Sequence, residues 1–214
     1  MKNRKGFTLM ELLVAVFIAS MVTIALMTVW KASSMQTSQG QRQSIIRNNL
    51  SIFMRALHRD ITEADLILAP DTSASGGVIV AVRNAYLVKE GASYYVLPNT
   101  ISYTKDPGGP QIESDPIAFA YCQEGSTIRR SREIPLKELS HDSLEKSSLI
   151  SNAESACSSG RIYMDYIVAN GFDVSTDDNI NYTVSLIVHK DFEGSENPPV
   201  HIEMSKTFIK AGGA

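Results

Sequence analysis

The chain has 214 residues, of which 43% are hydrophobic and 20% are charged, and its net charge is −3. This length allows one domain with an appendage, or at most two small domains, with a real buried core, so general disorder is not expected. Lys2, Arg4 and Lys5 precede a long apolar run, so the remainder has 17 basic against 23 acidic residues and a net charge of −6. Because phosphates require a basic face, nucleic acid is not predicted as a partner.

The first predicted element is an apolar helix over residues 7–30. From Leu12 to Trp30 the sequence has 19 residues without a charge. A helix that begins at Phe7 would span about 36 Å, which is enough to cross a bilayer. A cleavable secretory signal would be shorter and would end at a small-residue site. The basic residues before the run predict that its start is cytoplasmic and that residues after Trp30 lie outside.

Glu11 lies one turn into this apolar run. A carboxylate in hydrocarbon costs several kcal/mol unless it is neutralised or paired, so its presence predicts a functional role. The alternative is an interfacial residue whose carboxylate reaches the headgroups. Position alone leaves both interpretations open.

The string "KGFTLMELLVAV" from Lys5 onward resembles the processing and assembly motif of type IV pilins and type II secretion pseudopilins. Only Met10 departs from that motif, where isoleucine is commoner. The resemblance implies that a prepilin peptidase removes residues 1–6 by cutting between Gly6 and Phe7, and that the new amine of Phe7 is methylated. It also implies that Glu11 pairs with the amine of a neighbouring subunit, which would turn two costly charges into one neutral contact at a defined axial stagger.

The resemblance implies a non-enzymatic subunit of a type IV pilus or a type II secretion-like filament. Such a subunit is held in the bacterial inner membrane with its head in the periplasm, and then enters the pilus or pseudopilus. The expected partners are other pilins or pseudopilins, the prepilin peptidase, the inner-membrane assembly platform and membrane lipid. The large head is loosely similar to J-type minor pseudopilins and W-type minor pilins.

Two other classes compete with this interpretation. A single-pass inner-membrane protein with a periplasmic binding or hydrolytic domain would keep the anchor but would remain uncut between Gly6 and Phe7. A secreted soluble protein would be cut after the apolar run, near Lys31. Sequencing of the mature N-terminus separates the three.

An amphipathic continuation of the helix is predicted over residues 31–69. Apolar residues recur at spacings of three and four from Ile46 to Ala64, and charged residues, including Asp60, fall largely off that stripe. No proline precedes Pro70, so one helix is expected from about Thr8 to Leu68. The polar stretch around Gly40 is the weakest helix former and predicts a bend or a frayed segment.

Residues 70–214 are predicted to form a β-rich head. Beyond residue 76 the pattern changes to short strand-like runs separated by turn residues. The runs are "GVIVAV", "NAYLVKEGASYYVL", "TISYTKD", "PIAFAYC", "STIRRSR", "RIYMDYIVAN", "YTVSLIVHKD" and "HIEMSKTFIK". They predict one or two antiparallel sheets packed on the amphipathic helix, an α+β pilin-like fold. The polar stretch over residues 137–160 either includes a short helix or is a loop.

Cys122 and Cys157 both follow the apolar segment. If that segment exports the head, they lie in a compartment where disulfides persist, which favours a bridge between them. On the loop-entropy model such a bridge contributes about 3 to 4 kcal/mol. Two separate buried thiols are the alternative.

No catalytic residue, cofactor or metal site is predicted. Ser143 and Lys146 form an S-x-x-K pattern, but the further motifs of serine acyltransferases are missing from the sequence. The four histidines, His58, His141, His189 and His201, show no metal-binding spacing. The basic string "TIRRSRE" predicts a charged strand face.

A calcium site in the head is the one metal alternative. Hard oxygen ligands are offered by Asp173, Asp177, Asp178 and Asn181. Their spacing does not match an EF-hand loop, so a solvated turn is favoured.

Overall fold

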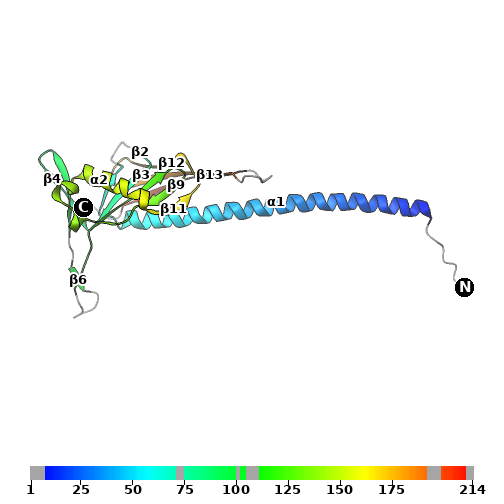
Figure 1. Ribbon diagram of the computed structural model, residues 1–214, viewed down its shortest axis with the longest axis horizontal. Coiled ribbons are helices and arrows are strands. Elements are labelled where there is room, and N and C mark those ends of the chain that lie inside the picture. The colour runs from blue at the N-terminus through cyan, green and yellow to red at the C-terminus, as the bar shows by residue number, and fades with distance from the viewer. Residues whose placement is uncertain (1–7, 71–74, 100–101, 105–110, 192–198, 211–214) are drawn as a thin grey trace. The chain divides into compact units, whose positions relative to one another are not determined.

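The computed structural model describes residues 8–70, 75–99, 102–104, 111–191 and 199–210. The chain divides into two compact units, residues 1–46 with 192–198 and residues 47–191 with 199–214. Helix α1 runs from Leu9 to Thr62, so its last turns belong to the second unit. Figure 1 shows α1 as one long ribbon and the strands gathered in the second unit.

The stretch around Gly40 is helical throughout, so the frayed segment expected there is not present. Hydroxyl side chains in this stretch bond back to the helix: Ser34 Oγ donates to the carbonyl of Lys31, and Thr37 Oγ1 donates to the carbonyl of Ser33. These bonds occupy the side chains that would otherwise compete for the backbone in a non-helical conformation. The helix therefore continues through residues with poor intrinsic propensity.

The helix ends at Thr62, which is earlier than the predicted end at Leu68. Leu66–Ala69 instead forms strand β1, which pairs antiparallel with β3. The backbone N–H of Asp65, one residue before β1, donates to the carbonyl of Val82 and makes the first hydrogen bond of this strand pair. A strand partner that is distant in sequence thus overrides the apolar spacing that favoured helix.

All described strand pairs are antiparallel, and the predicted α+β fold is confirmed. The first sheet has the order β1-β3-β8-β9-β11, with β10 paired to β8, and the second has the order β14-β13-β12-β2. Two separate hairpins join β4 to β5 and β6 to β7. The strands after β1 are β2 Ser75–Gly76, β3 Val78–Arg83, β4 Ala85–Glu90, β5 Ser93–Pro98, β6 Ser102–Thr104, β7 Gln111–Glu113, β8 Ile117–Glu124, β9 Thr127–Arg130, β10 Ile134–Pro135, β11 Arg161–Asp165, β12 Ile167–Thr176, β13 Asn181–Lys190 and β14 Val200–Ile209.

The amphipathic face of α1 packs on the sheets, as its spacing predicts. Leu50, Phe53 and Leu57 are fully buried. The ring of Phe53 lies 5.9 Å from that of Tyr121 in β8 and 6.2 Å from that of Phe172 in β12, in edge-to-face arrangements. One helical residue thus contacts both sheets, and edge-to-face pairs of this kind add to the stabilisation from apolar burial.

The opposite face of the first sheet is covered by a short helix, α2, which runs from Lys146 to Ser155. Leu149 and Ala153 of α2 belong to a buried cluster with Val80 of β3 and Ala120 of β8. The polar stretch over residues 137–160 therefore includes a helix, together with 3-10 turns at Leu136–Glu138, His141–Leu144 and Ala156–Ser159. Burial on both faces explains why "VIVAV" and "IAFAYC" are continuous apolar runs.

Candidate functional site

The N-terminal motif lies at the start of α1. Gly6 and Phe7, the predicted processing residues, lie outside the described residues. Thr8 precedes the first helical residue, and its backbone N–H and Oγ1 both donate to Glu11 Oε2 at 2.9 Å. The backbone N–H of Glu11 donates in return to Thr8 Oγ1 at 3.3 Å. This reciprocal pair is a capping box, in which a threonine and a glutamate three residues later satisfy orphan donors of the first turn.

The large apolar side chains after Glu11 are exposed. Their exposed fractions range from 52% for Val14 to 78% for Trp30. Among the described residues α1 is the one helix long and apolar enough to cross a membrane. An apolar surface of this extent requires lipid or a protein partner to cover it.

A buried carboxylate joins the last turns of α1 to the first sheet. Asp60 is 1% exposed, although its position falls off the apolar stripe. Its Oδ1 accepts from Arg83 Nη2 at 2.8 Å, and its Oδ2 accepts from Tyr121 Oη at 2.7 Å and from Arg130 Nε at 3.0 Å. These partners come from β3, β8 and β9, so one side chain of α1 bonds three neighbouring strands.

The groups around Asp60 are held in single protonation states. Burial, followed by the charge of Asp60, raises the pKa of Tyr121 well above its usual value, so the phenol remains a donor. Burial lowers the pKa of Arg130, but the hydrogen bond to Glu133 and the charge of Asp60 outweigh it, and the net pKa is raised. The Arg130 guanidinium also lies 4.4 Å from the centre of the Phe119 ring. The cluster therefore attaches the last turns of α1 to the first sheet.

The basic string that predicted a charged strand face contributes to this cluster. Arg130 is the residue of "TIRRSRE" that reaches Asp60. Arg129 pairs instead with Glu124, its Nε lying 2.9 Å from Glu124 Oε2. Arg130 therefore contacts an acidic side chain 70 positions earlier in the sequence.

Cys122 and Cys157 form a disulfide, as predicted. The bridge links β8 to the 3-10 turn that follows α2. Both half-cystines are buried in the cluster beneath α2. The bridge therefore fixes α2 and its flanking turns, a segment rich in polar residues, against the first sheet.

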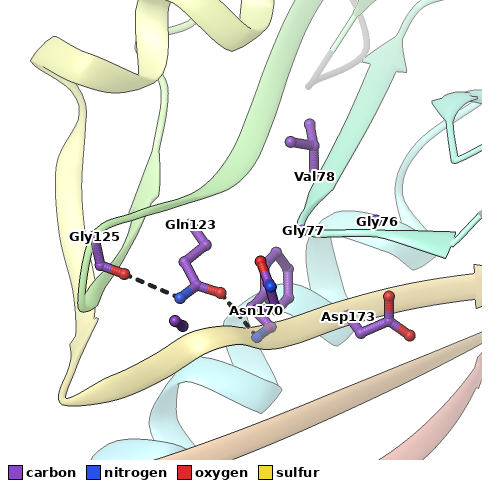
Figure 2. A pocket seen from close by; sticks show the side chains of 9 residues that line it. Gly76, Gly77, Val78, Gln123, Gly125, Asn170 and Asp173 are labelled. Carbon is purple, nitrogen blue, oxygen red and sulfur yellow. Dashed lines mark hydrogen bonds between the residues drawn. The ribbon is translucent and has the colours of Figure 1, made fainter.

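A hollow of about 560 Å³ lies where the two sheets meet. Figure 2 shows Gln123 between Gly125 and Asn170, with dashed bonds toward Gly125 and toward β12, and Asp173 further along the β12 ribbon. Gln123 Nε2 donates to the carbonyls of Gly125 and Val168, and its Oε1 accepts from the backbone N–H of Phe172. The side-chain amide thus takes the place of a pairing strand along the bulged part of β12.

The other polar residues singled out in the sequence do not form a reactive group. Asp178 Oδ1 accepts from the backbone N–H groups of Ile180 and Asn181, which lowers the Asp178 pKa and closes the β12–β13 turn. Ser143 Oγ lies 2.9 Å from Ser140 Oγ. Across the described part of the chain, no three histidine, cysteine or acidic side chains are placed to hold a metal ion.

Comparison with known proteins identifies the N-terminal segment alone. Residues 1–27 match the family described as the prokaryotic N-terminal methylation motif. No curated protein and no solved structure matches the chain significantly. The match includes Gly6, Phe7 and Glu11 together with most of the exposed apolar stretch of α1.

Proposed function

We propose that this chain is a minor pilin or minor pseudopilin, a structural subunit of a type IV pilus or of a type II secretion-like filament. The observation that supports it best is the coincidence of two independent features in one segment. Residues 1–27 match the methylation motif, and from Leu9 onward this segment is helical with exposed apolar side chains. A membrane before assembly and neighbouring helices afterwards would cover that surface in turn.

The proposed order of events begins with cleavage between Gly6 and Phe7 by a prepilin peptidase. This removes the leader with its three basic residues and leaves an amine, which is then methylated, one residue before Thr8. Residues 7–30 would anchor the subunit in the inner membrane, residues 31–69 would continue from that anchor, and the head (residues 70–214) would lie in the periplasm. The assembly platform would then transfer the subunit from lipid into the filament.

Glu11 would serve two purposes in this sequence of events. In the single chain it closes a capping box with Thr8. In a filament its carboxylate would pair with the Phe7 amine of the adjacent subunit, because an unpaired charge is costly in an apolar core. The head would then be structural, and the buried ion pairs of Asp60 with Arg83 and Arg130 would hold it to the helix.

The test is the chemical identity of the mature N-terminus. Mass spectrometry of the full protein purified from membranes is expected to show Phe7 as the first residue with one added methyl group. Replacement of Gly6 by a bulky residue should leave the chain uncut. A mature protein that begins at Met1 would favour the alternative, a single-pass inner-membrane protein with a periplasmic binding or hydrolytic domain.

A further inference from the structure

Two histidines face each other across the last two strands of the second sheet. His189 of β13 and His201 of β14 are directly opposite in the antiparallel register, and their ring centres lie 5.7 Å apart. The backbone N–H of His189 donates to the carbonyl of Tyr166, which precedes β12 on the other side of β13. His189 and His201 are therefore a non-hydrogen-bonded pair, the type in which opposite side chains lie closest. Local spacing did not reveal this pair, because only the strand register brings the two positions together.

Each of the two imidazoles has its own carboxylate. His189 Nε2 lies 3.3 Å from Asp191 Oδ1, and His201 Nε2 lies 3.1 Å from Glu203 Oε1. A carboxylate that accepts a hydrogen bond from Nε2 fixes the tautomer whose lone pair is on Nδ1. Histidines that bind metals commonly have this arrangement, in which one nitrogen binds the ion and the other donates to a carboxylate. Both rings are thus oriented as metal ligands usually are.

The chemistry of the pair favours a transition metal. Neutral imidazole suits zinc, copper and nickel, whereas calcium and magnesium prefer oxygen ligands. The histidine side chains are 39% and 51% exposed, so an ion can reach them from solvent. Because the carboxylates bond the other ring nitrogens, the chain would supply two ligands and water the rest. This agrees with the finding that no three such side chains are placed around one ion in the described ranges.

His141 provides an internal comparison. Its Nε2 lies 3.3 Å from Glu90 Oε2, so it has the same kind of carboxylate contact. Its ring, however, stacks on that of Tyr95 at 4.4 Å, and an aromatic ring is not a metal ligand. A contact between a histidine and a carboxylate therefore occurs elsewhere in the head without a second imidazole beside it, and the cross-strand pairing is what distinguishes His189 and His201.

We infer that His189 and His201 form a binding site for a transition-metal dication such as Zn²⁺, with Nδ1 of each ring on the ion. Asp191 and Glu203 would hold the rings in position and offset the charge of the ion. The site lies where β13 ends and β14 begins. Among the described strands, β14 pairs with β13 alone, so a bound ion would fasten this edge strand to its neighbour. This inference is independent of the proposed filament function.

Zinc titration of the tag-free full chain in detergent micelles tests the site. Calorimetry with ZnCl₂ is expected to show one ion bound at this site per chain. The melting temperature should rise with zinc concentration, because the ion binds the folded state in which the two strands are paired. An excess of CaCl₂ should not displace the zinc, because calcium does not compete for imidazole nitrogen.

Substitutions separate the ligands from their supports. Asp191→Asn with Glu203→Gln should weaken zinc binding about tenfold, as the loss of such supporting carboxylates usually does. His189→Gln or His201→Gln should each weaken it further, because a single imidazole cannot chelate the ion. The double histidine variant should bind little more weakly than either single variant. His141→Gln is the matched control and should leave zinc binding unchanged.

NMR of the imidazole nitrogens identifies the atoms that bind. Zinc should shift the Nδ1 resonances of His189 and His201 and leave Nε2 protonated. Zinc binding that survives the loss of both histidines would overturn the site, and so would an equal loss of binding in His141→Gln. Zinc found on Nε2 would overturn the assigned role of the carboxylates. Zinc can be titrated whether or not the chain is cut after Gly6, so this inference and the proposed function fail separately.

Discussion

The carboxylate of Asp60, in a helix, accepts a 2.7 Å hydrogen bond from the hydroxyl of Tyr121, in a strand 61 positions later. Both side chains are about 1% exposed. Arg83 and Arg130 bring positive charge to the same carboxylate. In the proposed filament subunit, the contact between helix and head would have to withstand displacement of the helix, and this cluster lies at that contact.

Asp60→Asn is expected to destabilise the second unit strongly. The substitution keeps the volume of the side chain but leaves the partly buried Arg83 and Arg130 with only the half-exposed carboxylates of Glu63 and Glu133 as partners. Removal of one partner from a buried ionic group costs about 3 to 5 kcal/mol. Urea unfolding of the full chain in detergent micelles measures the change, with exposed Asp165→Asn as the control. A loss no larger than that of the control would mean that the cluster is solvated in solution.

Tyr121→Phe is expected to change the alkaline stability of the protein. The folded chain raises the pKa of Tyr121, whereas in the unfolded chain the phenol keeps its usual pKa of 10.0. Below that value the phenol is protonated in both states and its contribution to stability is fully present. Above it the unfolded state releases the proton first, so stability falls as pH rises. Unfolding followed across this range should therefore show a steeper alkaline loss for the wild type than for Tyr121→Phe, and parallel curves would contradict it.

Gln123→Leu is expected to weaken the junction between the two sheets. The side-chain amide accepts a hydrogen bond from the backbone N–H of Phe172 and donates one to the carbonyl of Val168, and leucine can make neither bond. Each unsatisfied group costs about 1 to 3 kcal/mol when water cannot replace the bond. Hydrogen exchange should then be faster at the Phe172 amide, with Asn152→Leu on the exposed side of α2 as the control. An unchanged exchange rate at Phe172 would show that the amide bond does not protect it.

The disulfide gives a prediction that concerns the exported protein. Cys122 and Cys157 should be oxidised to each other, so peptide maps with and without reductant should differ only in the fragments that contain them. The paired residues are 35 positions apart, and Cys122→Ser with Cys157→Ser should cost about 3 to 4 kcal/mol of stability on the loop-entropy model. Free thiols on the folded protein recovered from the periplasm would contradict the pairing.

Local patterns predicted the parts of this fold that local patterns determine. The spacing of Leu50, Phe53 and Leu57 predicted a buried helix face, and continuous apolar runs predicted the central strands. The end of α1 was missed because Leu68 continues the helical spacing, whereas pairing with β3 decides its conformation. The burial of Asp60, which falls off the apolar stripe, was not predicted. Its partners lie 23 to 70 positions away, and no local pattern reveals them.

The capping box was also missed, although its signal is local. Thr8 and Glu11 stand in the T-x-x-E spacing that predicts such a pair at the start of a helix. The carboxylate that is costly in hydrocarbon thus also bonds to Thr8 at the helix end. The two roles call for different chemistry, which makes them separable by substitution.

Glu11→Val tests whether the carboxylate is required for assembly. The variant should bind the membrane more strongly, because a costly charge is removed, and it should still be cut between Gly6 and Phe7. Incorporation should fail, because the amine of the adjacent subunit would enter the apolar core unpaired, at a penalty of about 3 to 5 kcal/mol. The measurement compares cleaved protein in membranes with protein recovered in sheared or over-assembled fibres.

Two further variants distinguish pairing from capping. Glu11→Gln keeps a side chain that functions in a capping box but removes its charge. Thr8→Ala removes the cap but keeps the carboxylate, at a cost of about 1 kcal/mol to the helix end. If Glu11 pairs with a neighbouring amine, Glu11→Gln should fail in fibres as Glu11→Val does, while Thr8→Ala should assemble. Normal recovery of Glu11→Gln, together with failure of Thr8→Ala, would assign Glu11 to the cap of its own helix and not to contact between subunits.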